Sequence, residues 1–284
     1  MERSPRRPRN CRSRTPCRSR SRSTSSSSTT RSASNGDRPV SDSPTSRLNP
    51  SRKGTVPFCV DVVIPALDEE GALPRVLGEI PRGWVRRVVV ADNGSTDRTA
   101  EVARAGGAEV VTELERGYGA ACLAALTHLA DDPPDVVVFV DGDYSDHPAE
   151  LPSLVQPIID GDADMVIGSR VTGEREAGAL SVQQQVGNAI ACHALRILYD
   201  VQYTDLGPFR AIRWEILRSL DMRDRDFGWT VEMQIKAAKR GIRHREVPVS
   251  YRPRIGVSKI SGTIRGSVRA GAKILWLLGR STWR

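Results

Sequence analysis

The stretch FVDGDYSDHP, residues 139–148, holds the side chains of this chain that are best suited to chemistry. Asp141 and Asp143 directly follow the apolar run VVVFV, which has the composition of a buried strand. Carboxylate oxygens are the ligands that hard divalent cations such as Mg²⁺ and Mn²⁺ prefer. Alternate residues of an extended segment face opposite ways, so the two carboxylates act together only if Gly142 lets the chain turn.

Asp146 and His147 complete this acidic stretch and stand directly before Pro148. Proline is favoured in the first turn of a helix, and Asp is a frequent capping residue. We therefore expect Asp146 and His147 to cap a helix that begins at Pro148. The alternative is that His147 ligates a metal.

Short apolar runs alternate with helical patterns along the first half of the chain. Strands are expected over 56–66, 85–92, 108–113 and 135–141, and helices over 71–80, 97–106 and 119–130. The strands are near-continuous runs of Val and Ile, which is typical of a parallel sheet covered on both faces in βαβ units. The pattern predicts an α/β, Rossmann-like fold.

Polar clusters follow three of these strands, at residues 65–70, 92–97 and 141–143. Each cluster alone consists of ordinary turn and capping residues. Ligands of open α/β sheets bind beyond the carboxyl ends of the strands, where all three clusters would meet. Their coincidence therefore favours a binding site at that edge.

Three common motifs of such sites are missing. The chain has no GxGxxG after the first strand, no GxxxxGK[ST] and no GxSxG. A dinucleotide-binding dehydrogenase, a P-loop NTPase and an α/β-hydrolase are therefore disfavoured.

The chain resembles the family 2 glycosyltransferases, whose fold is called GT-A. The resemblance lies in VVIPALDEE, VVVADNGSTDRT, ERGYGAACLAAL, FVDGDYSDHP, DMVIGSR, DLGPFRAIRW and FGWTVEMQIKAAKRG, in that order over about residues 58–260. Within the family it is most similar to dolichyl- and polyprenyl-phosphate sugar synthases. The resemblance implies a mixed, mostly parallel sheet flanked by helices, and a hexose transfer from a nucleotide sugar with inversion at the anomeric carbon.

The resemblance also implies roles for the residues of the first half. Pro65, Ala66 and Glu69 would line the nucleotide, and Asp92 would accept a hydrogen bond from the imide of the base. Asp141 and Asp143 would hold Mg²⁺ or Mn²⁺, with Asp143 touching the metal directly and Asp141 nearer the sugar or ribose.

Two positions depart from the pattern of the family. Asp68 stands where Asn is usual, and Asn93 stands where a second Asp is frequent. These departures leave the choice between a UDP-sugar and a GDP-sugar open.

The second half is expected to bind the acceptor. Arg170 is placed like an arginine that lies near the acceptor phosphate in the lipid-phosphate enzymes, and Lys259 resembles a residue that closes over the diphosphate. The alternative for both is a solvated surface charge.

The need for a general base depends on the acceptor. A phosphate oxygen is already ionised and needs no base, whereas a hydroxyl would need one, and Glu232 is then the candidate. Asp205 is the weaker candidate for this base and is expected instead to be a structural partner of Arg210 or Arg213.

The chain divides into a tail over residues 1–53, a catalytic domain over 54–260 with halves 54–150 and 151–260, and a basic amphipathic helix over 261–284. The tail holds 14 basic and 3 acidic residues, net +11, and the remainder holds 28 basic and 31 acidic, net −3. The Arg/Ser-rich tail has almost no apolar side chains and is expected to be disordered.

The last segment of the chain bears on whether the protein contacts a membrane surface. Ile260, Ile264, Val268 and Leu275 share one face of the expected helix, and basic residues share another. This helix either contacts a membrane surface or closes the domain.

Three functions remain open. The first is a cytoplasmic enzyme, peripheral on the inner face of the membrane, that glycosylates a polyprenyl phosphate. The second has the same core and a soluble or cell-envelope hydroxyl acceptor. The third is a nucleic-acid-binding protein that acts through its tail.

Overall fold

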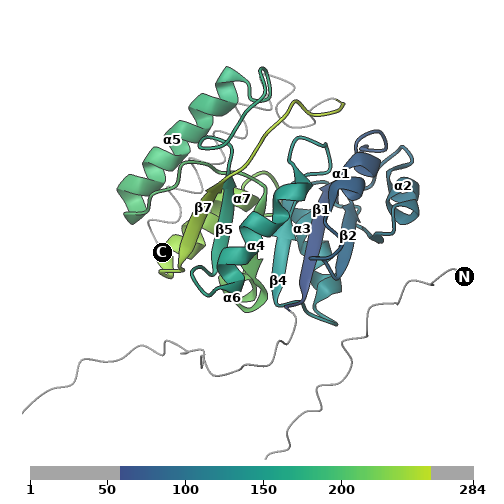
Figure 1. Ribbon diagram of the computed structural model, residues 1–284, viewed down its shortest axis with the longest axis horizontal. Helices are drawn as coiled ribbons and strands as arrows, with labels where there is room; N and C mark the ends of the chain where they lie inside the picture. Colours follow the sequence, from purple (N-terminus) through teal and green to yellow (C-terminus); the bar gives the residue numbers. More distant parts are fainter. Residues whose placement is uncertain (1–57, 257–284) are drawn as a thin grey trace, which may run out of the picture. The chain divides into compact units, whose positions relative to one another are not determined.

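The computed structural model describes residues 58–256 of the chain. These residues form a seven-stranded sheet with helices on both faces, in the strand order β3-β2-β1-β4-β6-β5-β7 (Figure 1). The strands are β1 (Val60–Ala66), β2 (Arg87–Asp92), β3 (Glu109–Thr112), β4 (Val136–Phe139), β5 (Met165–Ser169), β6 (Arg210–Arg213) and β7 (His244–Pro248). The helices are α1 (Leu73–Glu79), α2 (Thr99–Ala105), α3 (Tyr118–Leu129), the 3₁₀ turn η1 (Pro148–Glu150), α4 (Leu151–Ile159), α5 (Val182–Tyr199), α6 (Trp214–Leu220) and α7 (Trp229–Lys239).

The sheet is mixed. Strands β1, β2, β3 and β4 pair in parallel, as do β5 and β7. Strand β6 runs antiparallel to both of its neighbours, β4 and β5. The expected mixed, mostly parallel sheet is therefore confirmed, and each strand and helix expected in the first half forms, with the expected type.

Both faces of the sheet are buried, which explains why its strands consist of continuous apolar runs. Every residue of β1 is buried. Val62 and Ile64 pack into a core with α1, α2 and α4, whereas Val63 packs on the opposite face with α3, α6 and α7. Burying one such side chain stabilises the fold by roughly 1.5–3 kcal/mol, so the central strands are held strongly in place.

The loops after β1, β2 and β4 emerge at one edge of the sheet because these three strands are parallel neighbours. Among the described helices, none has both the length and the apolar composition that a bilayer crossing requires. The tail expected over 1–53 and the helix expected over 261–284 lie outside the described residues.

Candidate active site

A pocket of about 380 Å³ opens at the edge of the sheet where β1, β2 and β4 end. Three loops that follow these strands contribute to it, together with the start of α3 and two segments from the second half of the chain. The lining residues are Pro65, Ala66, Leu67, Glu69, Asn93, Arg116, Gly117, Tyr118, Ala121, Asp141, Gly142, Asp143, Asp226, Phe227 and Arg254. A volume of this size and an edge of this kind are typical of small-molecule sites.

Asp141 and Asp143 both line this pocket. Gly142 between them does not have a positive φ; instead, a Cβ there would lie 3.3 Å from the carbonyl oxygen of Pro65, closer than most real Cβ contacts. The chain turns at Gly142 and Asp143. The next residue, Tyr144, has a φ of 66°, which lies in the left-handed region. The expected turn at Gly142 is therefore confirmed, but the glycine serves the close approach to β1 rather than a positive φ.

The carboxyl group of Asp141 lies among protein groups at the pocket wall. Tyr118 donates a hydrogen bond from its hydroxyl to Oδ1 of Asp141 over 3.1 Å. Burial, followed by the nearby charge of Asp143, raises the pKa of Asp141 to about 6. Two carboxylates that resist ionising together would gain from a cation placed between them.

Asp143 is bound on both of its carboxylate oxygens. The backbone N–H and the hydroxyl of Ser145 donate to Oδ1 over 2.9 and 2.5 Å, and the guanidinium of Arg254 forms an ion pair with Oδ2. Lys259, which was expected to close over the diphosphate, lies outside the described residues. Arg254 was not singled out from the sequence, although it stands in the basic run RPR five residues before Lys259.

Asp146 and His147 do not cap the following helix, and that expectation was wrong. Oδ2 of Asp146 accepts a hydrogen bond from the backbone N–H of Asp141 over 3.1 Å, so the carboxylate turns back toward the pocket loop. Its Oδ1 is buried and has no hydrogen-bond partner within residues 58–256. Burial, followed by the charge of Asp141, raises the pKa of Asp146 well above its ordinary value. His147 precedes η1 and makes no capping side-chain hydrogen bond.

Arg252 holds the turn at Tyr144 from outside. Its Nε donates to the carbonyl oxygen of Tyr144 over 2.6 Å, and its Nη2 donates to that of Asp146 over 3.0 Å. The guanidinium carbon lies 3.3 Å from the centre of the Tyr144 ring, and Glu79 binds both Arg252 and the Tyr144 hydroxyl. These contacts stabilise a backbone conformation that is unfavourable for an aromatic residue.

The residues expected to line the nucleotide lie partly in the pocket. Pro65, Ala66 and Glu69 are among its lining residues. Asp92 is buried at the end of β2, and its Oδ1 accepts a hydrogen bond from the backbone N–H of Ser95 over 3.1 Å. Asp92 itself does not line the pocket, whereas the next residue along the chain does.

Asn93 is that next residue, and its amide explains why it replaces aspartate. Its Nδ2 donates to the carbonyl oxygens of Glu113 and Glu115 over 3.0 and 2.7 Å, and its Oδ1 accepts from the N–H of Gly117 over 2.8 Å. A carboxylate could not donate the first two bonds. Asn93 thereby holds the loop that carries Arg116 into the pocket.

Asp68, the other departure from the pattern of the family, ties the loop after β1 to the loop after β2. Its φ is 52°, a conformation that Asp and Asn both tolerate. Its Oδ1 accepts the backbone N–H of Thr96 over 2.7 Å, and its own N–H donates to the Ser95 hydroxyl over 2.9 Å. The substitution is therefore compatible with an ordered loop.

The loop before α7 reaches the pocket because two glycines let it approach α3. A Cβ at Gly117 would lie 2.0 Å from the carbonyl oxygen of Arg225, and one at Gly119 would lie 1.9 Å from that of Asp224. No side chain other than hydrogen fits at either position. This close approach places Asp226 in the pocket lining.

Glu232 is not part of the pocket lining. Its Oε2 accepts hydrogen bonds from the backbone N–H groups of Arg223 and Asp224, over 3.1 and 2.7 Å. Its Oε1 forms an ion pair with the Lys236 ammonium over 2.7 Å. Glu232 thus shapes the loop that presents Asp226. The carboxylate of Asp226 has no hydrogen-bond or ionic partner within residues 58–256, and the alternating charges of RDRD were the sequence signal for it.

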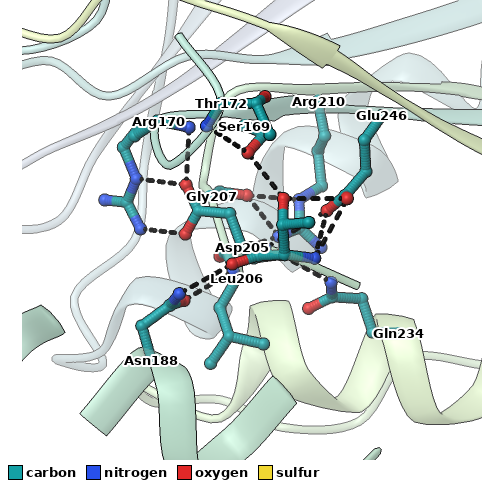
Figure 2. Close-up of polar contacts among 11 residues, drawn as sticks. Ser169, Arg170, Thr172, Asn188, Asp205, Leu206, Gly207, Arg210, Gln234 and Glu246 are labelled. Carbon is teal, nitrogen blue, oxygen red and sulfur yellow. Dashed lines mark hydrogen bonds and ion pairs between the residues drawn. The ribbon is translucent and has the colours of Figure 1, made fainter. Parts of the chain in front are cut away.

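Arg170 lies outside the pocket lining and is bound by Asp205, as Figure 2 shows. Its backbone N–H, Nε and Nη2 all donate to the Asp205 carboxylate, over 2.8, 2.8 and 2.7 Å. Its guanidinium also lies 5.0 Å from the centre of the Tyr251 ring. Asp205 is therefore a structural partner, as expected, but of Arg170 rather than of Arg210 or Arg213.

The loop around Asp205 is held by side chains from several elements (Figure 2). Asn188 of α5 donates to the carbonyl oxygen of Thr204, and Gln234 of α7 donates to that of Asp205. Glu246 of β7 accepts the backbone N–H groups of Thr204 and Asp205. Arg210, which is fully buried, donates to backbone carbonyl oxygens of the same loop and of α7. This network fixes the position of Asp205 and through it of Arg170.

The carboxylates of the pocket fit a divalent cation that shares its ligands with a substrate. Within residues 58–256, no three His, Cys, Asp or Glu side chains gather as a ready-made metal site. Mg²⁺ is commonly bound by one or two carboxylates that are completed by water and substrate phosphates. Asp141 and Asp143 provide such a pair, and Asp143 already binds a cationic group, the guanidinium of Arg254.

Comparison with known proteins gives consistent results. Residues 61–220 match the model of the family described as glycosyl transferase family 2. An uncharacterized glycosyltransferase of Mycobacterium tuberculosis is 41% identical over 214 residues, which cover 74% of this chain and 94% of that protein. A dolichyl-phosphate hexose transferase of Haloferax volcanii is 37% identical over 202 residues, covering 70% of this chain and 85% of that one.

A solved structure with the same fold is that of glucosyl-3-phosphoglycerate synthase from Mycobacterium tuberculosis in complex with Mn²⁺, UDP and phosphoglyceric acid. The TM-score is 0.65 at 24% identity, and the match covers 79% of this chain and 78% of that one. This likeness confirms the GT-A fold. The chain belongs to glycosyl transferase family 2 and is an enzyme, a glycosyltransferase.

Proposed function

We propose that this enzyme transfers a hexose from a UDP- or GDP-sugar to a polyprenyl phosphate, with inversion and with Mg²⁺ or Mn²⁺ as cofactor. The observation that carries the proposal is one pocket that combines Asp141 and Asp143 with two guanidinium groups, Arg116 and Arg254. The carboxylates suit a metal and the guanidinium groups suit the phosphates of a nucleotide. A nucleotide sugar needs both, because its diphosphate is the leaving group.

The residues of the pocket would divide the work as follows. Asp141 and Asp143 would hold the metal, which when bound neutralises charge on the leaving diphosphate. Arg116 and Arg254 would orient the diphosphate, and Pro65, Ala66 and Glu69 would line the nucleotide. Catalysis would rest on positioning and charge neutralisation, without a covalent enzyme intermediate.

The base of the nucleotide would lie near the end of β2. In this proposal Asp92 accepts a hydrogen bond from a ring N–H of uracil or guanine, which adenine does not offer. Because Asp92 already accepts the N–H of Ser95 with Oδ1, the base would use its remaining acceptor capacity.

The acceptor is proposed from the relatives. The dolichyl-phosphate hexose transferase named above is similar to this chain over most of its length. A polyprenyl phosphate acceptor would bring the enzyme to the inner face of the membrane as a peripheral cytoplasmic protein. Its phosphate oxygen is ionised at neutral pH, so the reaction would need no general base.

A hydroxyl acceptor is the second candidate function, and Asp226 is the observation that favours it. Asp226 offers a carboxylate in the pocket, whereas Glu232 is occupied by backbone N–H groups and Lys236. With a hydroxyl acceptor, Asp226 would accept its proton in place of the base first expected at Glu232.

The variant Asp226→Asn distinguishes the two acceptors. We expect it to retain transfer to a polyprenyl phosphate, because that oxygen carries no proton at neutral pH. With a hydroxyl acceptor, the rate would fall by about a hundred- to ten-thousand-fold, the usual contribution of a general base. The measurement is kcat with each acceptor for Asp226→Asn and wild type, and a large loss with polyprenyl phosphate contradicts the expectation that this acceptor needs no base.

Removing the guanidinium that holds Tyr144 should weaken metal binding. We expect Arg252→Ala to raise the Kd for Mn²⁺ by about ten- to a hundred-fold, because groups that orient metal ligands have effects of this size. Mn²⁺ binding is measured by electron paramagnetic resonance, and Arg245→Ala is the matched control because Arg245 is exposed and pairs with Asp162. Equal Kd values for Arg252→Ala and wild type would show that Tyr144 keeps its turn unaided.

Calorimetry with a panel of donors tests the proposed function directly. The panel is UDP, GDP, UDP-glucose, UDP-GlcNAc and GDP-mannose, each with and without Mn²⁺. We expect one nucleotide to bind in a metal-dependent manner, which also chooses between UDP and GDP. If folded protein binds none of them, the proposed function is wrong, and the nucleic-acid hypothesis for residues 1–53, which lie outside the described residues, becomes the next to test.

A further inference from the structure

Helix α5 carries an apolar stripe on its outward side. Val182, Val186, Ile190 and Ile197 are 71%, 52%, 54% and 69% exposed. At about 100° per residue these four side chains fall within one narrow arc of the helix. We call them the outer stripe of α5; the helix lies at the edge of the molecule beside the β5 and β7 end of the sheet (Figure 1).

The outer stripe is additional to the face with which α5 joins the core. Ala191, Cys192 and Leu195 are buried and lie on the opposite side of the helix. The helix itself is well defined, because Ser181 and Gln184 form a reciprocal cap at its start. Four exposed β-branched side chains in one line on a stable helix indicate a surface that packs against another chain segment or molecule.

The end of the chain contains a stripe with the same spacing. Ile260, Ile264, Val268 and Leu275 are separated by four, four and seven residues, as are the residues of the outer stripe. In a helix each stripe would be about 22 Å long. Two apolar stripes of equal length and pitch can pack side by side along their whole length.

Shortly before the end of the described residues, the chain passes the segment that precedes α5. Tyr251 donates its backbone N–H to Glu174 and accepts that of Glu176, six residues before Val182. The five residues from Tyr251 to Gly256 can span at most about 17 Å. The chain then runs to the pocket loop, where Ile255 donates its backbone N–H to the carbonyl oxygen of Asp143 over 2.9 Å. Ile260 follows nine residues after Tyr251, a connection of at most about 30 Å, which allows a parallel alignment with α5.

We propose that residues 260–275 form a helix that packs in parallel along the outer stripe of α5. The short connection favours this occupant over a second copy of the chain, because a tethered segment has a local concentration in the millimolar range. The basic side chains Arg265, Arg269 and Lys273 then point away from α5. The packed segment also anchors the chain that carries Arg254 beside the pocket. The proposal does not depend on the acceptor or on the metal.

Photocrosslinking of the full-length chain tests which occupant covers the stripe. p-Benzoylphenylalanine replaces Ile190, and Leu114, an exposed apolar residue of the loop after β3, carries the same group as the control. We expect crosslinks from position 190 within the monomer to peptides of residues 260–284, and none from position 114. Crosslinks between two chains, crosslinks only to added anionic phospholipid vesicles, or no crosslinks from position 190 would each overturn the proposal.

Hydrogen exchange gives a second measurement that does not need the unnatural residue. We expect the double variant Ile264→Asp/Val268→Asp to speed amide exchange in residues 182–199 at least fivefold. The matched control, Arg265→Asp/Arg269→Asp, changes the opposite side of the same segment and should leave that exchange at the wild-type rate. Equal exchange in both variants would contradict the packing of this segment on α5.

Discussion

Replacing Asp143 with asparagine is expected to lower metal-dependent hexose transfer by about a hundred- to a thousand-fold while the fold survives. Losing one group that stabilises developing charge has effects of this size. The asparagine can still accept the hydrogen bonds that Ser145 donates to Oδ1, so the turn remains supported. The substitution removes the negative charge that binds Arg254 and, in our proposal, the metal.

The measurement for Asp143→Asn is donor turnover as a function of Mn²⁺ concentration, with the melting temperature recorded in parallel. Asp162→Asn serves as the control, because it removes one charge from an exposed ion pair that does not line the pocket. An Asp143→Asn enzyme with wild-type turnover and an unchanged response to Mn²⁺ would refute the metal assignment.

Replacing Asp205 with alanine is expected to lower the free energy of unfolding by about 3–5 kcal/mol. The change leaves the guanidinium of Arg170 largely buried without its carboxylate, and breaking a buried ion pair on one side has a cost of this order. The loop network of Figure 2 would also lose the residue at its centre. The measurement is urea unfolding followed by circular dichroism.

Two further variants make this prediction specific. The double variant Asp205→Leu/Arg170→Met should recover much of the lost stability, because apolar pairs often replace buried ion pairs without loss. Asp162→Ala, from the exposed pair with Arg245, should change the unfolding free energy by less than about 1 kcal/mol. If Asp205→Ala is as stable as wild type but loses transfer activity, Arg170 has the role near the acceptor phosphate that the resemblance suggested.

The fold and the position of the site could be predicted because both depend on local patterns. Continuous Val and Ile runs require cover on both faces, as β1 and β4 have, and parallel neighbours bring their following loops to one edge. Asp141 and Asp143 were found in this way. The antiparallel β6 within the sheet is a matter of how the second half pairs, which short-range patterns do not encode.

The sequence by itself determined the family, the sheet and the acidic loop that faces the pocket, because these follow from periodicity and from motifs within a few residues. Only the tertiary structure decided the partners of charged groups. Arg170 and Asp205 lie 35 positions apart, and Arg254 reaches Asp143 across more than a hundred. An ion pair depends on where two backbones meet in space, which short-range patterns do not encode. For the same reason only the tertiary structure shows that Asp226 lines the pocket and that Glu232 binds the loop behind it.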